Sequence, residues 1–146
     1  MPDTVIAAQA LQPCLAAEHA AVYGYALLGG VLSAAVSDGP WAKAATASYE
    51  THRDRRDILT ELIGAAGGKP VVAEPAYDSP FQVAGVPTAR RLAQYLEARC
   101  ASVYARATAA TTEDTRLMVS GTLLDCAVRG ARWGAAPTAF PGLDHA

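Results

Sequence analysis

The stretch GGKPVVAEPAYDSPFQVAGVP, residues 67–87, decides the fold, because it separates two pairs of long helical segments. Two glycines followed by Pro70 end a helix, and four prolines without any helical period indicate an extended loop. Capping and turn signals predict four helices, over residues 4–36, 40–66, 88–110 and 112–134.

The lengths of the connections predict the topology. Turns of a few residues join the first helix to the second and the third to the fourth. A loop of about 20 residues can cross the whole length of such helices, because extended chain covers about 3.3 Å per residue. We therefore predict one all-α domain over residues 1–146, a four-helix bundle with a long crossover loop between the second and third helices.

Composition and charge argue against several classes of protein. A net charge of −2 provides no general electrostatic attraction to nucleic acid or to an anionic membrane. Residues 20–36 are uncharged but reach only about 17 residues, so we expect a bundle helix and no membrane partner. The three cysteines form no Cys-x-x-Cys pair. No Lys or Arg precedes Lys43, so the N-terminus lacks the positively charged region of a signal peptide. A cytoplasmic protein with reduced thiols is expected.

Four groups of residues together resemble a known family. They are AEHAAVYGY at 17–25, HRDRRD at 52–57, EPAY at 74–77, and RW at 132–133 with PTAFP at 137–141. On these residues the chain resembles the ferritin-like superfamily, and more closely a ferritin-like family of unknown function from high-GC bacteria. The resemblance implies a ferritin-like bundle but no activity. In di-iron members, two helices each supply a Glu and the other two each supply a Glu-x-x-His pair on one face.

The di-iron pattern is incomplete in this sequence. Glu18 and Glu97 match the two single glutamates, but Arg53 and Val128 stand where the other two helices need histidine. An arginine brings fixed positive charge to the place of a cation, and too few ligands remain for two metals. We therefore expect a degenerate di-metal site, with no resident metal or other cofactor and no catalytic residue.

Helical phase indicates which polar side chains face the core. Glu18 falls at the centre of the apolar stripe of the first helix, and His52 lies on the inner side of the second. Glu97 and Asp125 border the stripes of the third and fourth helices, the latter stripe being Gly121, Leu124 and Val128. Because a buried carboxylate needs a partner, we predict a polar network of Glu18, His52, Arg56 and Asp125. If a metal site survives, its expected ligands are Glu18, His52, Glu97 and Asp125.

Three functions remain open. The leading hypothesis is a non-catalytic structural or interaction protein, because phosphate loops, nucleophile elbows and zinc-protease motifs are absent from the sequence. One alternative is an oxidoreductase or metal-handling protein with an atypical site. The other is a small-ligand binding module with a pocket under loop residues 75–81. His19 lies on a helix flank and is expected to bind no metal, and His145 in the tail is assigned no role.

We also expect a homodimer, with any other partner unknown. Glycines at 24, 29 and 30 let another helix approach the first one closely, either inside the bundle or across a two-fold axis. Exposed Trp41 or Trp133 would mark the same surface. Two-fold dimers are also the commonest oligomers.

Overall fold

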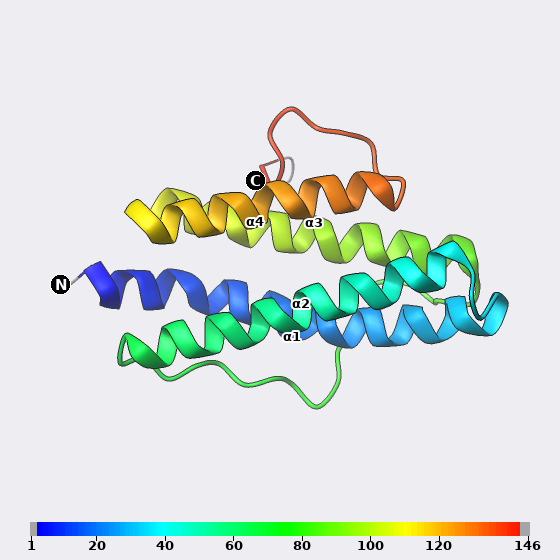
Figure 1. The fold of residues 1–146 in the computed structure, drawn as a ribbon, viewed down its shortest axis with the longest axis horizontal. Coiled ribbons are helices and arrows are strands. Elements are labelled where there is room, and N and C mark those ends of the chain that lie inside the picture. The colour runs from blue at the N-terminus through cyan, green and yellow to red at the C-terminus, as the bar shows by residue number, and fades with distance from the viewer. Residues whose placement is uncertain (1–2, 144–146) are drawn as a thin grey trace.

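The computed structural model describes residues 3–143, which form four α-helices and no strand (Figure 1). The helices are α1 (Asp3–Ala35), α2 (Pro40–Ala65), α3 (Val86–Ala110) and α4 (Glu113–Arg132). Each boundary lies within two residues of its predicted position. The all-α fold class is therefore confirmed, and His145 lies outside the described residues.

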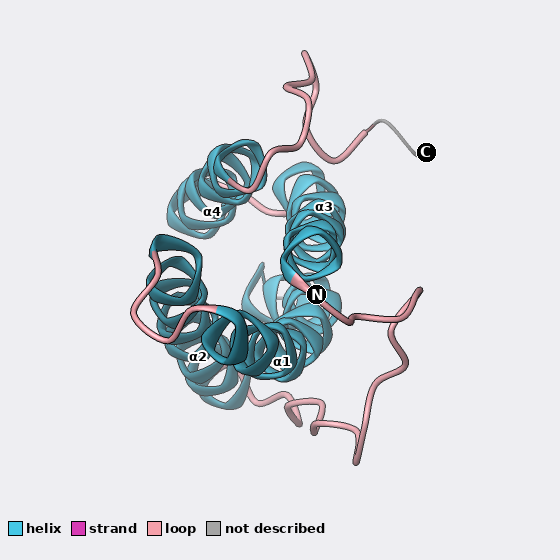
Figure 2. Cartoon of the chain, turned by 90° about the vertical axis from the view of Figure 1, so that its right-hand side faces the viewer, coloured by secondary structure: helices cyan, strands magenta, loops and turns pink. Residues whose placement is uncertain are grey.

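The crossover loop sets the direction of the last two helices. α1 and α2 are antiparallel, and the loop then returns along the bundle, so that α3 runs parallel to α2 (Figure 1). In the end-on view α1 packs on α2 and α3, and α3 packs on α4 (Figure 2). α2 and α4 lie further apart, and long polar side chains bridge them. The predicted crossover between the second and third helices is confirmed.

The loop is held at its start by a glycine cap and by a histidine. Gly67 has a positive φ of 82°, and the amide of Gly68 donates to the carbonyl of Ile63 at 2.9 Å, which ends α2. Further along, Nε2 of His19 lies 3.0 Å from the carbonyl oxygen of Val71. His19 therefore ties the crossover loop to α1 and lies away from the core.

α1 supplies the central stripe of the core. Its buried side chains include Leu11, Leu15, Glu18, Tyr25, Leu28 and Leu32. Gly24 lies directly under Leu96 of α3, where an added Cβ would come within 2.6 Å of a Leu96 methyl carbon. Gly29 faces Ala45 of α2 in the same way, at 3.6 Å. These two glycines therefore serve packing inside the bundle.

The expected stripe of α4 is wrong. Leu124 and Val128 are 66% and 42% exposed, and the helix buries a different set, Val119, Cys126 and Gly130. The reason is that α4 carries apolar residues on two sides, and periodicity alone does not say which side meets the core. Trp133 is also buried, at 2% exposure, and stacks on Trp41, so the tryptophans do not mark an outer surface.

One helix, Thr4–Ala35, is long and apolar enough to cross a membrane by length and composition, with a window of mean hydropathy 1.2. That signal is weak, because a core helix passes the same test and 39% of the window is buried inside the bundle. Glu18 lies near the middle of this helix and is paired within the core.

Candidate functional site

Three ionisable side chains from three helices meet at the centre of the bundle. Glu18 of α1, His52 of α2 and Glu97 of α3 are exposed by 0%, 0% and 1%. Nδ1 of His52 lies 2.5 Å from Oε2 of Glu18, and Nε2 lies 3.0 Å from Oε1 of Glu97. Each ring nitrogen therefore donates to a carboxylate, and the imidazole links α1 to α3.

Charge holds these three groups together. Burial alone would lower the pKa of His52, but hydrogen bonds and opposite charge from Glu18 and Glu97 outweigh burial and raise the pKa to about 10. At neutral pH the ring is thus an imidazolium between two carboxylates. Buried charges persist when they are paired and hydrogen-bonded, and this arrangement provides both.

Two tyrosines complete the hydrogen bonding of the carboxylates. The hydroxyl of Tyr104 donates to Oε1 of Glu18, and that of Tyr25 donates to Oε1 of Glu97, both at 2.6 Å. Burial, reinforced by the carboxylates, raises the pKa of both tyrosines above the usual value, so they remain protonated donors. Tyr25 also stacks on the His52 ring, with centroids 5.2 Å apart.

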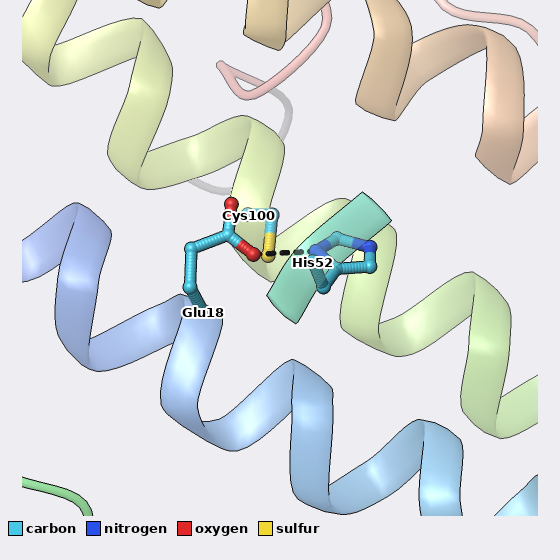
Figure 3. Close-up of side chains that lie close together, drawn as sticks. All are labelled: Glu18, His52 and Cys100. Carbon is cyan, nitrogen blue, oxygen red and sulfur yellow. Dashed lines mark hydrogen bonds and ion pairs between the residues drawn. The ribbon is translucent and has the colours of Figure 1, made fainter. Parts of the chain in front are cut away.

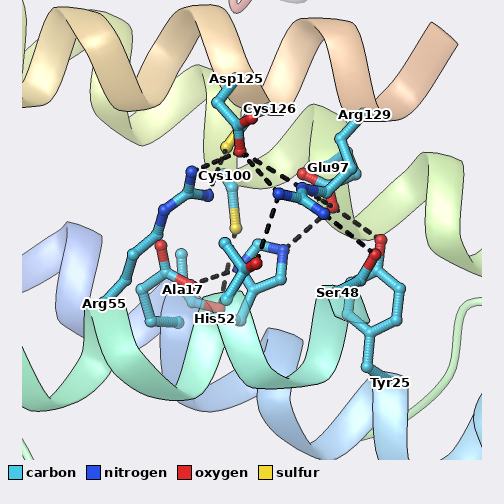
Figure 4. Close-up of polar contacts among 12 residues, drawn as sticks. Ala17, Tyr25, Ser48, His52, Arg55, Glu97, Cys100, Asp125, Cys126 and Arg129 are labelled. Atoms are coloured by element: carbon cyan, nitrogen blue, oxygen red, sulfur yellow. Dashed lines mark hydrogen bonds and ion pairs between the residues drawn. The ribbon is translucent and has the colours of Figure 1, made fainter. Parts of the chain in front are cut away.

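A second layer of charge bridges α2 and α4 above this centre (Figure 4). Nη2 of Arg55 donates to Oδ2 of Asp125, which also accepts from Nε and Nη2 of Arg129 at 3.2 and 3.1 Å. Burial opposes ionisation of Asp125, but the two arginines outweigh it and hold the pKa of that carboxyl below its usual value. Nε of Arg129 lies 3.9 Å from Oε1 of Glu97, which connects the two layers.

The prediction that Arg56 joins the network is wrong. Its guanidinium pairs with the adjacent Asp57 at 2.8 Å, and Arg55 takes the inward position. Viewed down the helix axis, the third residue after His52 is rotated by about −60° from it and the fourth by about +40°, so the two positions flank His52. α4 lies on the side of the third position, which selects Arg55.

Cys100 of α3 is the other group that approaches the centre. Its Sγ and donor atoms of Glu18 and His52 all lie within 4.8 Å of one another (Figure 3). A hydrogen bond with Cys126, together with burial, raises the pKa of the Cys100 thiol well above its usual value. The group is therefore a neutral thiol at pH 7.

The residues present do not fit a di-metal centre. Arg55 of α2 and Arg129 of α4 bring two fixed positive charges next to the centre, where they pair with Asp125, and fixed positive charge opposes the binding of a second cation. Asp125, expected as a ligand of any surviving site, has its Oδ2 bound by both of these arginines and stays a prediction as a ligand. Within residues 3–143, the potential donors that lie close together are Glu18, His52 and Cys100.

Besides Arg55, sequence reasoning missed four neighbours of the predicted residues. They are Tyr25, Cys100, Tyr104 and Arg129. Each follows a predicted residue at helical spacing, Cys100 three residues after Glu97 and Arg129 four residues after Asp125. The two tyrosines each follow a core glutamate by seven residues, which is two turns. These helical spacings are the sequence signal that could have placed the four residues beside the predicted ones.

A separate cavity of about 480 Å³ lies between α1 and α3 under the crossover loop. Its walls are mostly apolar and include three tyrosines, Tyr23, Tyr77 and Tyr95, the first two with ring centroids 5.5 Å apart. The volume lies within the range of small-molecule sites. None of its lining residues belongs to the polar network, so the two features are distinct.

Comparison with known proteins places this fold in a family. Among solved structures, the crystal structure of a conserved hypothetical protein, rv2844, from Mycobacterium tuberculosis superposes with a TM-score of 0.79 at 30% identity. The match covers 88% of this chain and 94% of that chain. No curated protein matches the sequence. A family model described as a domain of unknown function (DUF4439) matches residues 10–145. The chain therefore belongs to the DUF4439 family.

Proposed function

We propose that this protein is a non-catalytic helical scaffold, structural or interaction-based, whose core holds an ion-pair network where ferritin-like proteins hold metal. The observation that carries the proposal is that both ring nitrogens of His52 lie within hydrogen-bond distance of a carboxylate oxygen, one of Glu18 and one of Glu97. The imidazolium thus supplies the positive charge that a metal would otherwise bring to these two glutamates.

One energetic and one geometric argument favour the ion pair over a metal. A metal binds only the neutral imidazole, and removing a proton from a group of pKa about 10 at pH 7 costs about 4 kcal/mol. The 2.5 Å between His52 and Glu18 is also a hydrogen-bond distance. Two ligands on one ion, with bonds of about 2.1 Å, lie roughly 3 Å or more apart.

The test is metal binding by the untagged protein under anaerobic conditions. Fe(II) and Zn(II) are each titrated into the wild-type chain and into His52→Gln, and bound metal is measured after desalting. We expect substoichiometric metal in both proteins and no rise in the unfolding temperature of the wild type. One tightly bound ion per chain that disappears in His52→Gln would refute the proposal.

A single-ion site is the second candidate, and two observations favour it. Cys100 adds a soft donor to Glu18 and His52, a mixed set that suits Zn(II) or Fe(II). Oε2 of Glu97 is buried and has no hydrogen-bond partner within the described residues, so it could accept another interaction. Under this alternative, Cys100→Ser would weaken metal binding, whereas Cys14→Ser, also buried, would change it little.

A further inference from the structure

One face of α4 points away from the core and carries large apolar side chains. Leu117, Leu124 and Val128 are exposed by 73%, 66% and 42%. Gly121 lies between them, and a Cβ added there would meet nothing within 4 Å. The four positions follow at spacings of four, three and four residues, so they form one continuous stripe along the helix.

The stripe ends in opposite charges. Glu113 lies one turn before Leu117, and Arg132 lies one turn after Val128. At about 100° per residue, all six positions fall within an arc of about 100°. Glu113 and Arg132 are both exposed, and neither is in an ion pair within residues 3–143. Along α4 this face therefore begins with the acidic Glu113, continues as an apolar stripe and ends with the basic Arg132.

We propose that this face is the seam of a homodimer in which α4 of one copy packs antiparallel on α4 of a second copy. A two-fold axis midway along the stripe sets Leu117 of one copy opposite Val128 of the other. The same axis sets Leu124 opposite Gly121, so that a large side chain meets open space beside a small residue. At the centre of the seam, the large side chain of Leu124 from each copy thus packs against Gly121 of the other.

Charge complementarity is what selects a second copy as the partner. The register that pairs the apolar residues also sets Glu113 opposite Arg132 at both ends of the seam, without any further adjustment. Antiparallel packing also brings each helix N-terminus near the C-terminus of the other copy, so the helix dipoles attract. A parallel arrangement would instead set acid beside acid and base beside base. The proposal is independent of the core network, which shares none of these residues.

The first test is the mass in solution at micromolar concentration, by sedimentation or light scattering. The wild-type chain should have twice its 15.1 kDa mass, and Leu124→Glu should have the monomer mass. Ile58→Glu is the matched control, because Ile58 is an apolar residue of α2 that is 50% exposed outside the seam. It should remain dimeric. Unfolding curves establish that all three proteins are folded, and a monomeric wild type or a dimeric Leu124→Glu overturns the proposal.

The second test addresses the register. Glu113→Lys or Arg132→Glu alone sets like charges together at both ends and should weaken dimerisation about tenfold. Combining the two substitutions restores opposite charges and should bring the dissociation constant back to within about threefold of wild type. If the combined variant dimerises as weakly as the product of the single effects, the antiparallel register is wrong.

Discussion

Replacing His52 by glutamine should remove a pH dependence of stability that the wild-type protein has. The pKa of His52 rises from an unfolded value of 6.5 to about 10 in the folded protein, so the folded state binds the proton more tightly. The resulting stabilisation is fully present below pH 6.5 and is lost as the pH rises through about 10.

The size of the effect follows from the shift. Between the two pKa values the free energy of unfolding should fall by about 1.4 kcal/mol per pH unit. From pH 7 to pH 8.5 the wild type should therefore lose about 2 kcal/mol from this group alone. Glutamine can hydrogen-bond but carries no charge, so His52→Gln should lack this part of the slope.

The assay is urea unfolding of both proteins at a series of pH values, with the difference between them plotted against pH. The difference is needed because burial also raises the pKa of Cys14 to about 12, and a hydrogen bond with Cys126 together with burial raises the pKa of Cys100. Thiols of the unfolded chain therefore destabilise both proteins equally as pH rises above about 8.5. Taking the difference cancels that contribution.

Parallel slopes for the two proteins would refute the reasoning, because they would mean that His52 binds no extra proton on folding. A second measurement on the wild type alone gives an independent check. The ¹⁵N shifts of the His52 ring at pH 8 should be those of an imidazolium with both nitrogens protonated. A neutral ring at that pH would refute the charge assignment directly.

Three further changes test the core. Glu18→Gln removes one of the two carboxylates that pair with the buried imidazolium and should lower the free energy of unfolding by about 3 kcal/mol, measured by urea unfolding. The control is Glu50→Gln at an exposed position, which should change it by less than about 0.5 kcal/mol. Tyr104→Phe deletes a hydrogen bond to a charged group and should cost about 2 kcal/mol, and no loss would show that water replaces the hydroxyl. Gly24→Ala sets a methyl group 2.6 Å from a terminal carbon of Leu96, whose flexible end has to shift, and should lower stability by up to about 1 kcal/mol. Gly30→Ala, with open space around it, should instead raise stability by up to about 1 kcal/mol, and equal effects at the two positions would contradict the packing described.

Part of the candidate site could be predicted from the sequence. Glu18 lies within the apolar stripe of α1, and His52 lies among the inner positions of α2, so local phase placed both in the core. Helical phase did not decide whether Glu97 faces the core, because this residue borders the apolar stripe of α3; in the structure it is buried. Phase also did not separate Arg55 from Arg56, because both positions lie one turn from His52 on either side.

The sequence by itself determined four helices, their boundaries and the long crossover, because glycine, proline and other turn residues act over a few neighbouring positions. Only the tertiary structure decided which neighbours each helix meets. α4 carries apolar residues on two faces, and packing against α3 chose Cys126 and Gly130 while leaving Leu124 outside. The pairing of His52 with two carboxylates likewise depends on three helices meeting, which no local pattern encodes.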